Sequence, residues 1–493
     1  MKKVKELIAG FEYSLYGNTA LLETYAEDIT ASSAEARENT LFFCIKGAKT
    51  DGHLYAEEAY GKGARIFFCE RELSLPRGAL IIGVRDCREA MALVSAEFYS
   101  HPEKKLKIIG VTGTKGKSSV CEMIRHTLET AGKKAASVGT LGIRIGEAYE
   151  ETQNSTPESY VLYKAFHAMA EAGTEYAVME VSSQAVMQKR IFGLRFHSAV
   201  FTNLSPDHIG EYEHPDFEHY KECKKAVFAL CDTAFINADG DFAEEFISAC
   251  RGKAVTYGID KRADVSASEI SPQIFGESFG VSFLCRDGRE EREIRLCSPG
   301  KFSVYNALAA YAVCACEGVA PDKTAEALYS ARIKGRFETV PTARKDVTFI
   351  IDYAHNAESL ASALTAVREY FGGKVICVFG SVGGRTKNRR KEMGLCAGKL
   401  ADLCVITSDN PDREPADAII SEIAENIPHE KCVRIMNREE AIRYAVNCAE
   451  SGDAVMLAGK GHEDFQLING KKLPFSEREL LKKYAWEYVI SQT

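Results

Sequence analysis

The chain has 493 residues, of which 45% are apolar and 27% charged, and its formal net charge is −8. This length exceeds what one ordinary core supports, so we expect about three domains. The negative charge and the lack of a long basic tract argue against a nucleic-acid partner. No apolar run reaches the ~18 residues of a membrane helix, so we expect no membrane partner. The N-terminus is a poor signal peptide and the 16 scattered cysteines fit reduced core thiols, which favours a cytoplasmic protein.

The first stretch, up to about residue 104, mixes short β-rich runs with helical patterns. The runs are Thr40–Ile45, Ala64–Cys69 and Ala79–Val84. A polar, proline-containing segment, SHPEKKLK, precedes Ile108 and is typical of a linker. We therefore expect a small α/β domain over residues 1–104.

The second stretch, residues 105–335, opens with an apolar strand at Ile108–Thr112, a glycine-rich turn and a helix over Ser118–Ala131. Further strands are expected at Tyr176–Glu180 and Ala199–Asn203, with helical segments between them. Strands that alternate with helices indicate βαβ units and a parallel sheet. Ligands bind beyond the carboxyl ends of the strands in such sheets, and the unusual polar motifs of this chain lie at those ends.

The third stretch, residues 336–493, repeats this pattern and predicts a second sheet of the dinucleotide-binding type. Its expected strands are Val347–Asp352, Lys374–Gly380, Leu403–Thr407 and Ala454–Ala458. The expected fold class is therefore α/β, with three domains.

The segment IIGVTGTKGKSSV carries the strongest single signal. Gly113 and Gly116 let the backbone turn tightly after the strand and present N–H groups to phosphate oxygens. Lys117 adds a positive charge, Ser118 offers a hydroxyl to Mg²⁺, and the following helix directs its positive N-terminus to the same place. The strict G-x-x-x-x-G-K-[ST] pattern fails because Val111 stands at its first glycine, and the alternative is a turn that binds nothing. Strand, GKS and helix together favour a nucleotide site.

Two polar side chains follow other strands of the same sheet. Glu180 ends the strand before VSSQAVMQKR, and His208 follows a strand in FTNLSPDHIGEYEH. A glutamate beside a nucleotide loop can ligate Mg²⁺ or hold a metal-bound water. A lone histidine or glutamate is more often structural. Two of them at strand ends of a sheet that already carries a phosphate loop indicate a functional site.

The motif TGTKGKSS resembles the phosphate-loop motif of the Mur ligases and their folate-polyglutamate relatives, and the resemblance extends over nearly the whole chain. HYKECKKAVF resembles the family's Y-x-x-A-K-x-x-L-F, which places Lys224 where these enzymes carry a carbamylated lysine. The resemblance implies a central P-loop ATPase domain, a C-terminal domain for the amino acid and an N-terminal domain for uridine. Without the motif, Lys224 would be interpreted as a plain lysine on a helix surface.

The resemblance implies which residues serve catalysis, ATP and magnesium. GKFSVYNALAA places Asn306 at the adenine, GRFE directs Arg336 to the nucleotide, and DYAHNAES brings Asp352 and His355 over ATP. The implied catalytic residues are Lys117, Glu180, His208 and Lys224. The implied Mg²⁺ ligands are Ser118, Glu180, His208 and, if carbamylated, Lys224. The implied ATP-binding residues are Gly113, Thr114, Lys115, Gly116, Lys117, Ser118, Ser119, Asn306, Arg336, Asp352 and His355.

The resemblance also implies a site for UDP-MurNAc-dipeptide. ITASSAEARENTLFFCIKGAKTDGH resembles the family's uridine-binding segment, although Ser32 and Ala34 replace an aspartate and an arginine. NSTPES resembles N-T-T-P and keeps a hydroxyl at Ser155. The implied contacts are Ser33, Ala48, Lys49, Thr50, Asn154, Ser155, Thr156, Ser182, Gln188 and Arg190.

A third implied site holds the incoming amino acid. FGSVGGRTKNRRKEMG and LAGKGHEDFQ resemble family segments that bind it. The implied contacts are Arg385, Asp409, Asn410, Pro411, Asp412, Gly459 and Glu463. Family enzymes that add meso-diaminopimelate usually have DNPR, and Asp412 stands at that arginine here. An aspartate repels a carboxylate and attracts an ammonium, so this departure favours L-lysine or another basic amino acid, unless Arg413 takes the arginine's place.

The activity implied is an ATP-dependent ligase that adds the third amino acid to UDP-MurNAc-L-Ala-D-Glu through an acyl phosphate. Its partners would be small molecules (ATP, the UDP-MurNAc-dipeptide and the amino acid), and we expect a monomer. One alternative is a sister ligase, such as folylpolyglutamate synthase. Another is a nucleotide-binding partner subunit without catalytic activity, which the departures at Ser32, Ala34 and Asp412 motivate.

Overall fold

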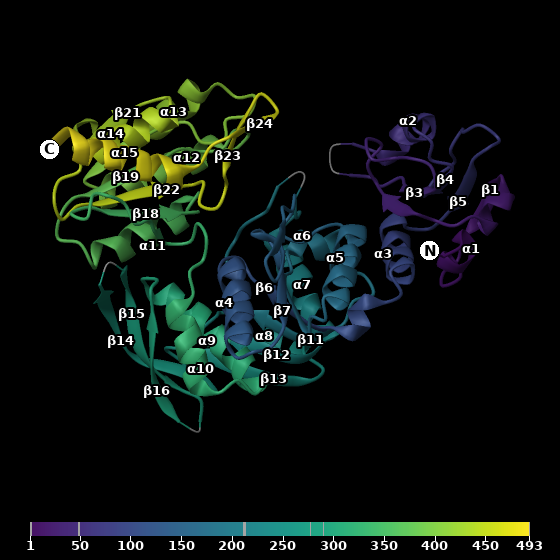
Figure 1. Ribbon diagram of the computed structural model, residues 1–493, viewed down its shortest axis with the longest axis horizontal. Helices are drawn as coiled ribbons and strands as arrows, with labels where there is room; N and C mark the ends of the chain where they lie inside the picture. The colour runs from purple at the N-terminus through teal and green to yellow at the C-terminus, as the bar shows by residue number, and fades with distance from the viewer. Residues whose placement is uncertain (1, 48–49, 211–212, 277, 289, 493) are drawn as a thin grey trace. The chain divides into compact units, whose positions relative to one another are not determined.

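The structure is a computed structural model that describes residues 2–47, 50–210, 213–276, 278–288 and 290–492 (Figure 1). The chain forms two compact units, Met1–Ser266 with Tyr305–Thr324 and Ala267–Val304 with Ala325–Thr493. None of the described helices combines the length and the hydropathy needed to cross a membrane.

The first unit begins with a five-stranded sheet over the described residues, in the order β1-β5-β4-β3-β2. Strands β2 to β5 are parallel, and β1 is antiparallel to β5. The elements are β1 (Ser14–Gly17), β2 (Asp28–Thr30), β3 (Thr40–Phe43), β4 (Ile66–Cys69), β5 (Leu80–Gly83), α1 (Val4–Leu7), α2 (Ala56–Gly61) and α3 (Cys87–Phe98). Alternate residues serve opposite faces, because Phe43 and Phe68 join the core with α3 whereas Phe42 and Phe67 join the core with α2.

The rest of the first unit is built on part of a second sheet, which has eleven strands over the described residues. The strands of this part run in the order β13-β12-β11-β6-β10-β7-β8-β9. Strands β13 to β7 of this order are parallel, as expected, whereas β8 and β9 are antiparallel at the edge. The strands are β6 (Lys107–Thr112), β7 (Ala135–Gly139), β8 (Gly142–Ile145), β9 (Ala148–Glu150), β10 (Tyr176–Glu180), β11 (Phe196–Phe201), β12 (Cys231–Asn237) and β13 (Lys253–Gly258). The helices are α4 (Lys117–Thr130), α5 (Ser159–Glu171), α6 (Ser183–Met187), α7 (Phe217–Lys225) and α8 (Ala243–Ala249).

The position of β6 explains where a ligand site can form. Its buried residues, such as Ile108, Ile109 and Val111, make the apolar run typical of a strand covered on both faces. Strand β10 lies on one side of β6 and β11 on the other, with Glu180 opposite Val111 and Phe201 opposite Thr112. The carboxyl ends of β10 and β11 therefore flank the loop that follows β6.

The chain passes from the first unit to the second within β14 (Val265–Phe275), whose first two residues pair with β13. Strands β15 (Ser278–Arg286) and β16 (Glu291–Leu296) then form an antiparallel pair. Helices α9 (Lys301–Cys316) and α10 (Pro321–Ser330) follow, and residues 305–324 belong to the first unit again.

The second unit contains a six-stranded sheet over the described residues, in the order β17-β18-β22-β19-β20-β21. Only the short β17 is antiparallel among these pairs. The strands, with a separate β23–β24 hairpin, are β17 (Glu338–Thr339), β18 (Thr348–Asp352), β19 (Val375–Phe379), β20 (Leu403–Ile406), β21 (Cys432–Arg434), β22 (Ala454–Ala458), β23 (Phe465–Ile468) and β24 (Lys471–Pro474). The helices are α11 (Ala357–Arg368), α12 (Lys387–Leu400), α13 (Ala416–Ala424), α14 (Arg438–Cys448) and α15 (Glu477–Gln492).

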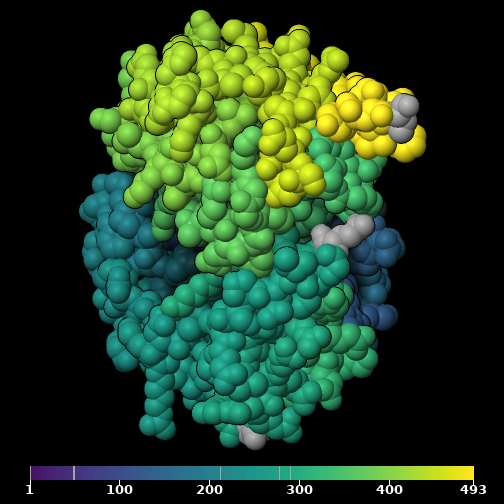
Figure 2. All heavy atoms as spheres, turned by 90° about the vertical axis from the view of Figure 1, so that its left-hand side faces the viewer, coloured from purple at the N-terminus to yellow at the C-terminus, as the bar shows by residue number. Residues whose placement is uncertain are grey.

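Helices cover both faces of this second sheet. Ile350 of β18 belongs to the core shared with α11, α12 and α13, whereas its neighbours Phe349 and Ile351 belong to the core shared with α14 and α15. In Figure 2 the yellow helix α15 lies at the surface of the unit. This alternation is the doubly covered α/β arrangement that the sequence predicts.

Two predicted strands, Tyr176–Glu180 and Ala454–Ala458, have the bounds that the sequence predicts. The strand expected at Ala199–Asn203 begins earlier and ends at Phe201. Its last two expected residues serve the neighbouring loop instead, because the Thr202 hydroxyl donates to the Lys115 carbonyl at 2.6 Å and Asn203 also contacts that loop.

Candidate functional site

The phosphate loop lies between β6 and α4. Gly113 and Gly116 have φ values of +144° and +85°, and a Cβ at Gly113 would overlap Thr202 Oγ1. Asn203, which follows β11, accepts the Lys115 N–H at 2.9 Å and donates to the Lys115 carbonyl at 3.1 Å. Because the N-cap Gly116 has no side chain that can cap α4, the positive end of the helix is left for an anion.

Two lysine side chains meet at the carbonyl oxygen of Gly113. Lys117 Nζ donates to it at 2.9 Å and to the Thr114 carbonyl at 3.0 Å. Lys224, from α7, donates to the same oxygen at 2.8 Å and is only 2% exposed. Burial, and then the nearby charge of Lys117, hold the pKa of Lys224 well below its ordinary value. Lys224 is therefore a buried loop contact and not a plain surface lysine.

Glu180 is buried at the end of β10 and holds the segment that follows β7. Its Oε1 accepts the Thr140 N–H at 2.7 Å, and its Oε2 accepts the Thr140 hydroxyl at 3.2 Å. The Thr140 hydroxyl also lies 2.9 Å from Ser155 Oγ. Sequence reasoning missed Thr140, for which the only signal is its place directly after the glycine that ends a strand.

The predicted dipeptide contacts form a network with the same strand end. The Thr156 hydroxyl donates to the Glu180 carbonyl at 3.0 Å and accepts the Ser182 N–H at 3.0 Å. The Ser182 hydroxyl caps α6. Arg190 donates to the Thr156 carbonyl at 2.9 Å. The structure thus brings together predicted residues from two separate motifs, NSTPES and MEVSSQAVMQKR.

Two further predicted contacts lie beside this network. Gln188 accepts a hydrogen bond from Arg190 at 2.7 Å, and Arg190 pairs with Glu158 at 3.0 Å. Asn154 is exposed. These positions leave Asn154 accessible to a ligand, while Gln188 and Arg190 brace the segment.

His208 has a different environment from Glu180. Its backbone has φ +56°, its side chain is half-exposed, and its Nδ1 lies 2.9 Å from Glu213 Oε1. The magnesium role of His208 therefore stays a prediction. Nearby, burial and the adjacent His219 lower the pKa of His214 to about 4, so the buried His214 ring is neutral at neutral pH.

The predicted uridine site is described only in part. Ser33 Oγ donates to Glu58 Oε2 at 3.0 Å, and Thr50 is exposed. The predictions for Ala48 and Lys49 lie outside the described residues. The uridine site stays a prediction.

The second unit presents polar groups at the end of β18. Asp352 accepts the N–H groups of Phe337 and Ala354, each at 2.8 Å, and its burial raises its pKa. The Arg336 guanidinium lies 4.4 Å from the centre of the Tyr353 ring. The backbone carbonyl oxygen of Tyr353 lies 2.7 Å from His355 Nδ1. Arg336, Asp352 and His355 therefore lie near the end of β18, and their contact with ATP stays a prediction.

A buried charged cluster joins the ends of β20 and β22. Lys460 is fully buried, and its Nζ lies 3.0 Å from Asn410 Oδ1, 3.3 Å from Glu463 Oε2 and 3.5 Å from Asp409 Oδ1. Asn410 donates to Glu463 at 2.8 Å, and burial raises the pKa of Glu463. Gly459 lies against Asp409. Lys460 was missed by sequence reasoning, although a lysine between two glycines of a matched motif is a usable signal.

Two other predicted amino-acid contacts lie outside this cluster. Arg385 is exposed on the loop after β19. Asp412 has φ +52°, and its carboxylate accepts the Gly470 N–H at 2.7 Å in the β23–β24 turn. The preceding Pro411 is buried. The Asp412 carboxylate is thus engaged with the hairpin, a role that differs from the predicted one of attracting a substrate ammonium.

Fold and site together define a nucleotide-binding enzyme of the α/β class, with a phosphate loop in one unit and a buried polar cluster in the other. Three family models match successive segments: "Mur ligase family, catalytic domain" residues 27–99, "Mur ligase middle domain" residues 111–314, and "Mur ligase, glutamate ligase domain" residues 335–461.

Curated proteins that match this chain over nearly its whole length are named as ligases. A UDP-N-acetylmuramoyl-L-alanyl-D-glutamate–2,6-diaminopimelate ligase from Caldanaerobacter subterraneus subsp. tengcongensis is 41% identical over 484 residues, which is 98% of each chain. A protein of the same name from Clostridium botulinum is 37% identical and covers 93% of this chain and 94% of its own. The chain therefore belongs to the Mur ligase family, and it is an ATP-dependent, amide-bond-forming ligase.

Solved structures agree on the fold. A UDP-N-acetylmuramoyl-L-alanyl-D-glutamate–2,6-diaminopimelate ligase superposes with a TM-score of 0.68 at 24% identity, covering 100% of this chain and 99% of the other. A MurF ligase from Thermotoga maritima in complex with ADP gives 0.64 at 17% identity, covering 95% and 99%.

Proposed function

We propose that the chain adds a diamino acid to the D-glutamate γ-carboxylate of UDP-MurNAc-L-Ala-D-Glu, with conversion of ATP to ADP and Pi. The observation that carries the proposal is the hydrogen-bonded network around Glu180. It links the predicted dipeptide segment, through Thr156 and Thr140, to the strand beside the phosphate loop. An acceptor carboxylate held by that segment would lie next to the bound nucleotide, as direct phosphoryl transfer requires.

The first step forms a bond between the γ-carboxylate oxygen and the γ-phosphorus of ATP, and breaks the bond from that phosphorus to the ADP oxygen. The products are an acyl phosphate and ADP. The N-terminus of α4 and the Lys117 ammonium offset negative charge on the transferring group, which is the main catalytic requirement of such a reaction. Thr156 and Arg190 orient the acceptor segment.

The donor set beside the loop fits Mg²⁺. Ser118 and Glu180 provide oxygens, which are the ligands this ion prefers, and both are buried. Lys224 fits only as a carbamate, and the lowered pKa of its amine favours the neutral form that adds CO₂. We therefore assign Ser118, Glu180 and carbamylated Lys224 to the ion, which when bound would offset phosphate charge. The assignment of His208 to the ion rests on the family resemblance alone.

The second step forms the amide. The neutral amine of the incoming amino acid attacks the acyl carbon, Pi leaves with the carbon–oxygen electron pair, and the amine proton passes to solvent. The carboxylates of Asp409 and Glu463 suit an ammonium of the substrate, and the buried Lys460 keeps them together. Arg385, exposed on its loop, suits the substrate carboxylate.

We propose 2,6-diaminopimelate as the amino acid, because it stands in the names of the similar curated ligases. L-Lysine is the second candidate, favoured by Asp412 in place of the family arginine. Engagement of the Asp412 carboxylate by the Gly470 N–H weakens that second case. Arg413, exposed beside it, is the residue we assign to the distal carboxylate of diaminopimelate.

The partners proposed are small molecules alone, and the site of action proposed is the cytoplasm, with the chain as a monomer.

The test is Pi release with UDP-MurNAc-L-Ala-D-Glu and equal concentrations of meso-diaminopimelate and L-lysine, with products separated by mass. We expect the diaminopimelate tripeptide to predominate, and Arg413→Ala to reduce that product selectively while Arg443→Ala does not. Predominant lysine product would overturn the diaminopimelate assignment. Turnover only with a folate-type acceptor would overturn the function.

A further inference from the structure

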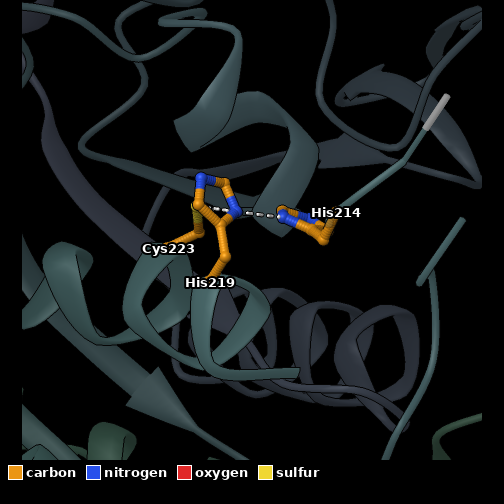
Figure 3. A group of neighbouring side chains, drawn as sticks. All are labelled: His214, His219 and Cys223. Atoms are coloured by element: carbon orange, nitrogen blue, oxygen red, sulfur yellow. Dashed lines mark hydrogen bonds between the residues drawn. The ribbon is translucent and has the colours of Figure 1, made fainter. Parts of the chain in front are cut away.

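Three side chains outside the phosphate loop place nitrogen and sulfur ligand atoms together. His214 Nδ1 lies 2.9 Å from His219 Nδ1, and Cys223 Sγ lies 3.8 Å from the same His219 atom (Figure 3). His219 and Cys223 stand one turn apart on α7, and His214 lies in the segment before that helix. All three ligand atoms lie within 4.8 Å of one another.

The Ser183 hydroxyl lies within hydrogen-bond distance of one ring nitrogen of His214. His214 Nε2 lies 2.9 Å from this hydroxyl, and both residues are buried. If Nε2 carries the proton and donates to Ser183, Nδ1 presents its lone pair toward His219. A partner on the other ring nitrogen is the usual feature that orients a metal-binding histidine.

The distances suit a tetrahedral ion after small shifts. Bonds of about 2.0–2.1 Å to nitrogen and about 2.3 Å to sulfur would separate two ligand nitrogens by about 3.4 Å, and nitrogen from sulfur by about 3.6 Å. The observed separations are 2.9 Å and 3.8 Å. Shifts of about half an ångström or less would bring these two separations to the tetrahedral values, and the third, between His214 and Cys223, lies within the 4.8 Å that encloses all three ligand atoms.

The thiol distinguishes this chain from the family pattern. In Y-x-x-A-K-x-x-L-F an alanine precedes the carbamylated lysine, whereas Cys223 precedes Lys224 here. Two imidazoles and a thiolate favour Zn²⁺ and similar ions, whereas the oxygen donors Ser118 and Glu180 favour Mg²⁺. The two donor sets therefore select different metals.

We propose that His214, His219 and Cys223 form a binding site for a divalent transition metal, with Zn²⁺ as the best match and one coordination position left to water. On binding, the Cys223 thiol proton leaves to solvent, and the proton shared by the two facing Nδ1 atoms moves to His219 Nε2. Because Cys223 adjoins Lys224, an occupied site would fix the turn of α7 that carries that lysine.

Titration of the metal-free, full-length chain with Co²⁺ tests the site optically. We expect one equivalent to give thiolate-to-cobalt charge transfer and tetrahedral d–d bands, which Zn²⁺ displaces and excess Mg²⁺ does not. Cys223→Ala restores the family residue, so it should fold and should lose the charge-transfer band. Ser183→Ala should weaken binding by about ten- to a hundredfold, and Cys316→Ser, an exposed cysteine elsewhere, should change nothing.

Two results would overturn the proposal. One is the absence of a charge-transfer band in the unmodified chain, which would leave the trio as a hydrogen-bonded group only. The other is an undiminished band in Cys223→Ala, which would assign the thiolate to another cysteine. Neither result depends on ligase activity, so the metal site and the proposed function can fail separately.

Discussion

Lys117 and Lys224 donate to one acceptor, the carbonyl oxygen of Gly113, at 2.9 Å and 2.8 Å. Two ammonium groups so placed repel each other, which is one cause of the lowered pKa of Lys224 after its burial. Carbamylation would replace this like-charge pair by an opposite-charge pair. The arrangement therefore favours modification of the buried lysine and leaves Lys117 as the cation.

Lys117→Ala removes the ammonium that we assign to the transferring phosphoryl group. We expect kcat to fall about a hundred- to a thousandfold, the cost of removing one preorganised group from a transition state. Coupled ADP release measures the effect. Lys164→Ala, an exposed lysine on α5, is the matched control. Near-parental activity of Lys117→Ala would remove the phosphate-loop assignment.

Lys224→Ala should be nearly inactive and should recover in part with formate or acetate, whose oxygens replace those of the carbamate. Lys225→Ala is the matched control, because Lys225 pairs with Glu222 at the adjacent position. Labelling with ¹³CO₂ should give a carbamate signal in the unmodified chain and in Lys225→Ala. A carbamate signal that persists in Lys224→Ala would contradict the assignment.

Thr140→Val removes the hydroxyl that bridges Glu180 and Ser155. A hydrogen bond to a charged group contributes about 1.5–3 kcal/mol, so kcat/KM for the UDP-substrate should fall about tenfold or more. Thr140→Ser keeps the hydroxyl and should retain most of the activity. Equal losses in the two variants would show that the hydroxyl has no positioning role.

Burial raises the pKa of Glu463, which gives the amino-acid site a pH dependence. The anionic form that suits a substrate ammonium is lost as pH falls through this raised pKa, earlier than for an ordinary glutamate. We expect KM for the amino acid to rise on acidification while KM for ATP changes little. In Glu463→Gln the KM for the amino acid should be high at every pH, without a further rise on acidification. If KM in that variant still rose on acidification as in the unmodified enzyme, the rise would belong to another group.

The parts predicted well from sequence are those in which local pattern decides structure. The phosphate loop is identified by its glycines, its lysine and its place between a strand and a helix. Few residue types are compatible with such tight turns and helix ends, so the sequence pattern is specific. Thr140 and Lys460 were missed because their roles arise from tertiary contacts. Asp412 was assigned by position alone, and the hairpin that engages its carboxylate is not visible in the sequence.

The acyl phosphate is the centre of the proposed chemistry, and an isotope experiment tests it most directly. UDP-MurNAc-L-Ala-D-Glu labelled with ¹⁸O in the γ-carboxylate is incubated with ATP, Mg²⁺ and the diamino acid, and the phosphate is analysed by mass. Transfer of phosphorus to that carboxylate, followed by amine attack, must deliver one labelled oxygen to each Pi. We predict singly labelled Pi in step with amide formation. Unlabelled Pi, or AMP and pyrophosphate in place of ADP, would contradict the proposed mechanism.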